Sequence, residues 1–179
     1  MIFLPDQMQH YKAVLKIAKE ILDRFGFQEM ATPIMEASGV FNHVGETSDI
    51  VTKETYTFPD RGGDMLTLRP EGTASVMHAV MSNSLTQSLP LKYYYAGPMF
   101  RYDRPQKGRY RQFHQLGIEL LGISGPESDA EVNAAADMLL KELNIRDDCV
   151  LHMNTLGDTE SRLSFTEALV TYFSKYWVV

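Results

Sequence analysis

The segment that most constrains this chain is residues 97–121, where two strand-like arms flank a polar turn. The first arm, residues 93–101, is aromatic and ends in the cation Arg101. The turn contains a proline and a glycine, which both favour reversal of the chain. A second arm of residues 110–121 follows. The pattern predicts a long β-hairpin.

The two arms are predicted to have chemically different faces, because residues two apart in a strand share a face. One face of the second arm is apolar and predicts a core contact: Leu116, Ile118 and Leu120. Its opposite face is polar around a glycine: Arg111, Phe113, Gln115, Gly117 and Glu119. The matching face of the first arm consists of Tyr95, Gly97, Met99 and Arg101. Because a strand glycine often marks the close approach of a ligand or another backbone, these faces predict the floor of a ligand site.

The turn between the arms is strongly basic. A single acid, Asp103, stands among five cations: Arg101, Arg104, Lys107, Arg109 and Arg111. Arginine grips phosphate through two parallel hydrogen bonds, so the hairpin suits phosphate or nucleic acid. A solvated basic turn is the usual alternative for a charge run. The neighbouring face with its glycine and carboxylate favours the ligand-binding interpretation.

Three stretches carry a resemblance to a known family. Residues 100–105, followed by residues 108–115, resemble motif 2 of class II aminoacyl-tRNA synthetases, and more narrowly that of bacterial-type histidyl-tRNA synthetases. Residues 68–74 resemble the amino-acid-binding turn of the same family, and residues 154–162 a later stretch. The resemblance implies an α+β fold with a class II synthetase-like antiparallel β-sheet flanked by helices. The irregular order of the expected helices and strands likewise disfavours a doubly wound parallel sheet.

The resemblance also implies a reaction: ATP-dependent activation of histidine and its transfer to the acceptor end of tRNA(His). It assigns catalysis to Arg101, which would also contact both substrates. ATP would meet Arg101, Asp103, Arg109 and Phe113, and Mg²⁺ would accompany it. The amino acid would meet Glu71, Gly72, Thr73, Arg101, Gln115 and Glu119. The tRNA would meet Arg104, Gln106 and Lys107.

Two alternatives stay open at this point. On chemistry alone, Glu71 and Thr73 would cap the helix expected at residues 74–81, and only the resemblance assigns them to the α-ammonium group. The second alternative concerns function. Synthetase-like paralogues serve as histidine-binding regulatory subunits of ATP phosphoribosyltransferase, without catalysis or a tRNA-binding loop.

Length and composition indicate a single globular domain of 179 residues with a net charge of −6. No apolar run approaches the roughly 20 residues that span a bilayer. We expect a cytoplasmic protein, with Cys149, its only cysteine, as an apolar core residue. The five histidines lack metal-ligand spacing, and we expect no protein-held metal site. His114 is expected to pack in the core.

The remaining elements follow from periodicity and capping. A helix is expected from Asp6, as N-cap, to Gly26, and another with Ser128 and Glu131 as a capping box. An edge or interface strand should contain Pro33, and the resemblance implies that it helps to form a homodimer. The other expected segments are a polar loop at 41–53, a hairpin at 56–58 and 65–68, a strand at 147–154, and a last helix from Asp158 or Thr159.

The chain ends in apolar and aromatic residues at 177–179. The resemblance implies that an inserted domain, motif 3 and an anticodon-binding domain belong beyond this point. We therefore expect residues 1–179 to be the first part of a class II catalytic domain, inactive alone.

Overall fold

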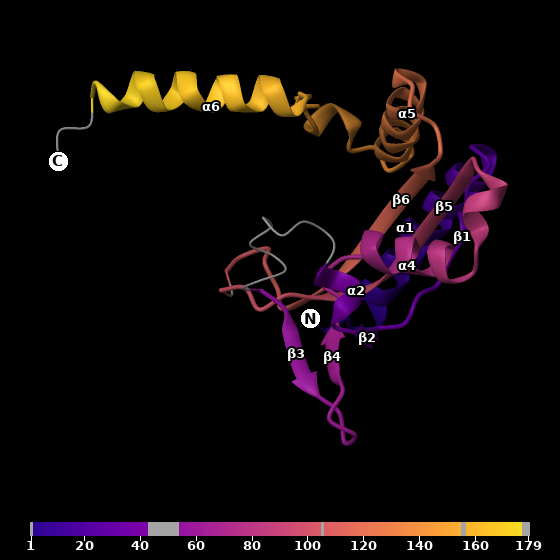
Figure 1. Cartoon of the computed structure of the whole chain (residues 1–179). Helices are drawn as coiled ribbons and strands as arrows, with labels where there is room; N and C mark the ends of the chain where they lie inside the picture. Colours follow the sequence, from indigo (N-terminus) through magenta and orange to yellow (C-terminus); the bar gives the residue numbers. More distant parts are fainter. Residues whose placement is uncertain (1, 43–53, 105, 155–156, 177–179) are drawn as a thin grey trace. The chain divides into compact units, whose positions relative to one another are not determined.

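The computed structural model describes residues 2–42, 54–104, 106–154 and 157–176 (Figure 1). The chain divides into two compact units, residues 1–146 and residues 147–179. The single-domain interpretation therefore stays a prediction. In the described residues no helix is both long and apolar enough to cross a membrane.

Helix α1 (Pro5–Arg24) opens the first unit, and its N-cap is Leu4. The prediction of Asp6 as N-cap is wrong, because proline is pre-organised for the first helical position and the helix begins there. The Leu4 N–H donates to Gln7 Oε1 at 3.0 Å, and Asp6 lies in the first turn, where a negative charge favours the helix dipole. The helix ends before Gly26, whose φ of +79° suits glycine.

The predicted long hairpin is confirmed as β5 (Leu91–Phe100) and β6 (Gln112–Leu121), which pair antiparallel. Figure 1 shows the two strands running side by side. The short strand β1 (Gln28–Glu29) pairs parallel with β5, so the order is β1-β5-β6. In this register Tyr95 lies opposite Gly117.

A second sheet carries the smaller hairpin. Its strands are β3 (Tyr56–Pro59) and β4 (Met65–Leu68), as predicted, with β2 (Met35–Ala37) on the other side of β4. All its pairs are antiparallel. The predicted strand around Pro33 is thus divided into β1 and β2, which belong to different sheets. The expected loop at 41–53 begins inside α2 (Gly39–Asn42), and residues 43–53 lie outside the described residues.

Helices cover both faces of the β1-β5-β6 sheet. On one face, α1 and α5 (Pro126–Glu142) pack through a buried cluster with which the predicted apolar face of β6 makes contact: Leu22, Phe27, Tyr94, Ala135, Leu116, Ile118 and Leu120. On the other face, α4 (Thr73–Ser82) contributes to a second cluster: Val76, Val80, Tyr95 and Met99. The 3₁₀ turns η1 (Leu85–Ser88) and η2 (Arg146–Asp148) complete the connections.

Helix α5 begins three residues earlier than predicted. Its N-cap is Gly125 and its first residue is Pro126, so Ser128 is not the N-cap. The Ser128 hydroxyl instead donates to the Gly125 carbonyl at 2.6 Å, inside the first turn. As in α1, a proline at the first helical position decides where the helix begins.

The second unit contains α6 (Thr159–Ser174), which begins after Asp158 as predicted. The Asp158 carboxylate accepts from the Ser161 N–H at 2.7 Å, and this hydrogen bond lowers the pKa of Asp158. The predicted strand at 147–154 is wrong: among the described residues it pairs with no strand, and a strand needs a partner for its backbone groups. The prediction of Cys149 as a core residue is also wrong, since its side chain is exposed.

Candidate functional site

Arg101 follows the last residue of β5, and three contacts orient it. Its N–H donates to the Arg111 carbonyl at 2.9 Å, which extends the hairpin pairing. Its Nε donates to the Pro70 carbonyl at 2.9 Å. The guanidinium carbon lies 5.0 Å from the centre of the Phe113 ring, within cation–π range. The charge is therefore held in place before any ligand arrives.

A cavity of about 740 Å³ opens beside Arg101. This volume lies within the range of small-molecule sites. Ten residues line it: Phe3, Tyr11, Glu54, Arg101, Asp103, Gly108, Arg109, Tyr110, Phe113 and His114. The structure thus brings together all four residues predicted to meet ATP.

The basic turn is ordered by its single acid. Asp103 Oδ2 accepts from Arg109 Nη1 at 3.0 Å, and Asp103 Oδ1 accepts from the Arg104 N–H at 2.7 Å. Arg111 stacks on the ring of Tyr102, with its guanidinium carbon 4.6 Å from the ring centre. The three residues assigned to tRNA are exposed and do not line the cavity: Arg104, Gln106 and Lys107.

His114 packs against aromatic rings, as predicted. Its ring centre lies 4.9 Å from that of Tyr11 and 5.4 Å from that of Phe3. Burial lowers the pKa of His114, so the neutral imidazole is favoured. The ring also lines the cavity, which was not predicted.

Three of the residues assigned to the amino acid, Glu71, Thr73 and Glu119, form an acidic cluster at the start of α4. Glu71 accepts from the N–H groups of Thr73 and Ala74 at 2.7 and 2.8 Å, so Glu71 does cap the helix. Thr73 does not share that role, because its hydroxyl donates to Glu119 Oε1 at 2.6 Å. One hydrogen bond thus joins the turn at residues 71–73 to the C-terminal part of β6.

Burial and charge make this cluster receptive to a cationic ligand. Burial raises the pKa of Glu119, and the nearby Glu71 carboxylate raises it further, while the Thr73 hydrogen bond opposes both effects. Among the described residues, the buried Gln115 Oε1 has no hydrogen-bond partner. A ligand that donates hydrogen bonds would satisfy this acceptor and relieve the repulsion between the carboxylates.

The space beside the glycines predicted to leave room for a ligand is filled by other side chains of this chain. A Cβ atom on Gly117 would lie 2.1 Å from Tyr95 Cζ, and one on Gly72 would lie 2.2 Å from the same atom. A Cβ atom on Gly97 would lie 2.5 Å from Arg69 Nη2. The prediction that these glycines form an open ligand floor is therefore wrong. The strands alternate as predicted, but the side chains of Tyr95 and Arg69 fill the space beside these glycines.

Tyr95 lies on the predicted face of the first arm, but its role in the site was not predicted. Its ring lies between Gly72 and Gly117, and its phenol interacts with Thr73 and Glu119. Burial raises the pKa of Tyr95, so the hydroxyl keeps its proton. The pairing of a tyrosine opposite a strand glycine was the available signal, since the missing side chain makes room for a ring.

Comparison with known proteins gives a consistent result. The family model described as histidyl-tRNA synthetase matches residues 2–157. A histidine–tRNA ligase of Gluconacetobacter diazotrophicus is 56% identical over 170 residues, which are 94% of this chain and 41% of that protein. One of Rhodospirillum rubrum is 51% identical over 173 residues, 96% of this chain and 42% of that protein.

Solved structures agree in fold. The structure of apo S. aureus histidyl-tRNA synthetase matches 98% of this chain and 41% of its own, with a TM-score of 0.75 and 32% identity. A Bacillus halodurans protein described as an ATP phosphoribosyltransferase regulatory subunit/histidyl-tRNA synthetase matches 79% of this chain and 36% of its own, with a TM-score of 0.69 and 26% identity. The chain spans about 41% of the length of the curated relatives that it matches.

Proposed function

This chain belongs to the histidyl-tRNA synthetase family, and we propose that it supplies the part of a histidine–tRNA ligase that binds ATP and histidine. The α+β architecture agrees with that family. The proposed reaction has two steps: activation of histidine by ATP, then transfer of histidine to tRNA(His). Because the chain spans 41% of its curated relatives, both steps are proposed for a complete protein that contains it.

The observation that carries this proposal is the position of Arg101 between two groups of residues. Arg101 lines the cavity with Phe113, Asp103 and Arg109. It also donates to the carbonyl of Pro70, whose neighbour in the chain is Glu71 of the acidic cluster. A charge in this position can contact ATP on one side and the amino acid on the other.

For the ATP side, we propose that Phe113 lies under the adenine, while Asp103 and Arg109 orient the adenine and phosphate end. In the first step the histidine carboxylate attacks the α-phosphorus and pyrophosphate leaves. Arg101 would stabilise the negative charge that develops between the two reactants. Removing one such pre-oriented donor typically lowers a rate about 10²–10³-fold.

For the amino-acid side, we propose that Glu71 and Thr73 bind the α-ammonium group, next to the Gly72 backbone. Gln115 and Glu119 would face the imidazole. Two features support this assignment. Among the described residues, the buried Gln115 Oε1 has no hydrogen-bond donor, and a ligand N–H would stabilise the partly buried Glu119 carboxylate by a hydrogen bond. The Glu71 capping bonds do not conflict with it, because each carboxylate oxygen can accept a second hydrogen bond.

For the nucleic acid, we propose that Arg104, Gln106 and Lys107 meet the acceptor end of tRNA(His), as their exposure allows. Mg²⁺ would enter with ATP, since this ion is usually held by phosphates and only one or two carboxylates. In the described part of the chain no group of three or more His, Cys, Asp and Glu side chains is arranged to hold a metal ion. The phosphates would therefore supply most of its ligands.

We also propose a cytoplasmic homodimer that uses the segment around Pro33. The neighbouring surface is apolar for an exposed region: Ile34, Met35 and Met65 expose 44%, 52% and 49% of their surface. Burial of such side chains against a second copy would be favourable.

The regulatory-subunit alternative is less well supported. The curated relatives at 46–56% identity are named histidine–tRNA ligases, and the turn keeps the exposed cations that a regulatory protein would not need. Histidine-dependent exchange of pyrophosphate into ATP by the complete protein would distinguish the two. We expect exchange with histidine and background levels with other amino acids. Histidine binding without any exchange would reject the ligase proposal in favour of the alternative.

A further inference from the structure

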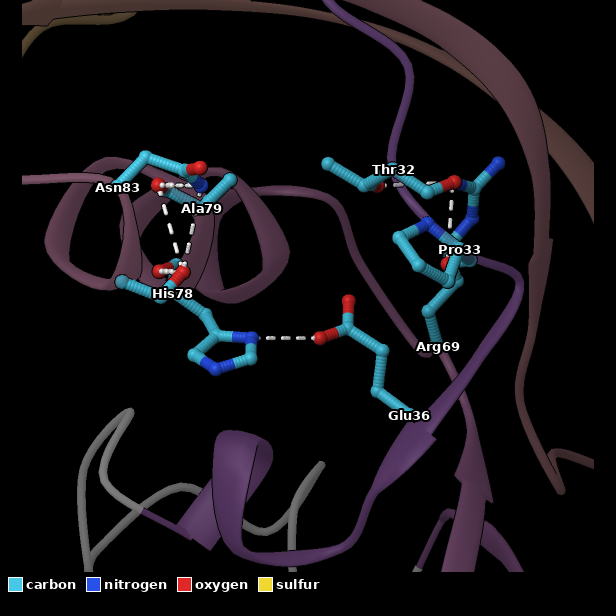
Figure 2. A network of polar contacts seen from close by, with 8 residues as sticks. Thr32, Pro33, Glu36, Arg69, His78, Ala79 and Asn83 are labelled. Carbon is cyan, nitrogen blue, oxygen red and sulfur yellow. Dashed lines mark hydrogen bonds and ion pairs between the residues drawn. The ribbon is translucent and has the colours of Figure 1, made fainter. Parts of the chain in front are cut away.

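Arg69 is a buried cation whose hydrogen bonds go to neutral oxygens (Figure 2). The residue is 6% exposed. Its Nη1 donates to the Thr32 carbonyl at 2.8 Å and to the Thr32 hydroxyl at 3.0 Å, and a 3.5 Å contact reaches the Pro33 carbonyl. Its Nε donates to the Pro98 carbonyl at 3.0 Å. Burial lowers the pKa of Arg69, and the nearby Glu36 carboxylate opposes this effect.

The Arg69 backbone fastens the same two segments as its side chain. Its N–H donates to the Ile34 carbonyl at 3.0 Å, and its carbonyl accepts from the Phe100 N–H at 3.0 Å. The guanidinium and the peptide groups of one residue therefore hold residues 32–34 against residues 98–100. The second segment is the end of β5, which leads directly into Arg101.

The position of Arg69 also affects Arg101 through the carbonyl of Pro70. Pro70 follows Arg69 and is almost completely buried, and its carbonyl accepts from Arg101 Nε at 2.9 Å. The proline ring also fixes the backbone between Arg69 and that carbonyl. The direction of the Arg101 side chain therefore depends on where Arg69 holds its own peptide.

The segment at residues 32–36, which Arg69 contacts, is itself held in place. Glu36, in β2, is buried, and its Oε2 lies 2.8 Å from Nδ1 of His78 in α4 (Figure 2). The segment that Arg69 grips is thus attached to the helix whose first turn carries Thr73. Residues 32–36 provide a fixed point rather than a loose loop.

We infer that Arg69 is a positioning residue for Arg101, acting through the Pro70 carbonyl and the end of β5. The positioning of Arg101 follows from these hydrogen bonds, and only its consequence for catalysis rests on the proposed function. A lysine cannot replace Arg69, since one ammonium group cannot hold the Thr32 and Pro98 carbonyls from two separate nitrogen atoms of a planar fork.

The test uses the 179-residue chain, labelled with ¹⁵N, and observes the Nε–H signal of Arg101 by NMR. An Arg101→Lys variant identifies the signal. In Arg69→Lys and Arg69→Met we expect this signal to shift and its hydrogen exchange to accelerate about fivefold, as the loss of a hydrogen bond worth about 1 kcal/mol would cause. Circular dichroism ensures that the spectra compare folded chains.

Lys92→Met is the matched control. Lys92, like Arg69, is a cation held by hydrogen bonds. It is half-buried on β5, bound to the Phe25 carbonyl at 3.2 Å and to Glu131, and it lies at the opposite end of the strand from Arg101. Its loss should destabilise the chain without changing the Arg101 signal. An equal change of that signal in Lys92→Met would show general loosening and overturn the inference.

Gly97→Ala provides a second route if the Arg69 variants fail to fold. It keeps the charge of Arg69 but places a Cβ atom 2.5 Å from Nη2, which forces the guanidinium to move. We expect the same change at Arg101. An unchanged Arg101 signal in folded Gly97→Ala, or in either folded Arg69 variant, would overturn the inference.

Activity of a complete synthetase containing this chain gives the catalytic consequence. There Arg69→Lys should lower kcat for pyrophosphate exchange about 10²-fold, because small misplacements of catalytic groups have effects of that size, while KM for histidine changes little. A raised KM with unchanged kcat would contradict a positioning role. Failure of the unmodified protein to exchange would reject the proposed function and leave the NMR result standing.

Discussion

Replacing Gly117 by alanine tests whether Tyr95 is held where the structure places it. The new methyl group would lie 2.1 Å from Tyr95 Cζ and 2.2 Å from its hydroxyl oxygen. The ring cannot retreat toward Gly72, where it already fills the space of the missing side chain. We therefore expect the ring to leave its position between the two glycines.

The expected destabilisation follows from three contributions. Overpacking of a core typically costs about 1–3 kcal/mol. Loss of the interactions of the phenol with Thr73 and Glu119 adds about 1 kcal/mol for a hydrogen bond. Against these, alanine restricts the unfolded chain and returns about 0.4–1 kcal/mol. The net prediction is a loss of about 1–3.6 kcal/mol, or a Tm lowered by about 2–14 °C for a chain of this size.

Thermal and urea unfolding of the 179-residue chain would measure this loss, with Gly39→Ala as the control. Gly39 has open space around its missing side chain and ordinary backbone angles, so its substitution should leave Tm almost unchanged. In a Tyr95→Ala background the Gly117→Ala change should cost less than about 0.5 kcal/mol, since the clash has been removed. If Gly117→Ala proved as harmless as Gly39→Ala, the placement of Tyr95 would be refuted.

Three further predictions concern charge, pH and length. In a complete synthetase, changing Arg104 and Lys107 to alanine should weaken aminoacylation while largely sparing pyrophosphate exchange; equal losses would assign both residues to the ATP site. Burial raises the folded-state pKa of Glu119, so its contribution to stability is present below its unfolded pKa of about 4.3 and is lost as pH rises through the higher folded value. Glu119→Gln should accordingly raise Tm at pH 7 and have little effect at pH 3.5, and a lowered Tm at pH 7 would contradict this. The 179-residue chain alone should fold yet charge tRNA at a negligible rate, because groups that act together are strongly non-additive; turnover near that of a complete ligase would refute it.

The sequence predicted those parts of the fold that local pattern determines. Alternation gave the β5–β6 hairpin and its two faces, and helical periodicity gave α1, α4, α5 and α6. The predicted starts of α1 and α5 were wrong because each segment contains both a capping residue and a proline. The helix begins at the proline, Pro5 or Pro126, rather than after the capping residue. The strand expected at 147–154 failed because a strand depends on a partner elsewhere in the chain, which local sequence does not reveal.

The site was predicted less completely than the hairpin that carries it. The structure places Arg101 and Phe113 together at the cavity, and their roles in ATP binding stay predictions. The roles of Tyr95 and Arg69 depend on contacts with residues far away in the sequence, such as that of Arg69 with Pro98, 29 positions further along the chain. The strand glycines indicated that another group lies close to the backbone, but only the fold shows that this group is a side chain of the same chain.

Pyrophosphate exchange by an Arg101→Ala variant of a complete synthetase containing this chain tests the central claim most directly. Arg24→Ala is the control, because Arg24 is an exposed cation at the end of α1 whose Nε donates only to the Glu20 carbonyl among the described residues. The account predicts that Arg101→Ala loses about 10²–10³-fold in rate while remaining folded, and that Arg24→Ala keeps its activity. Near-normal exchange by Arg101→Ala would contradict the account.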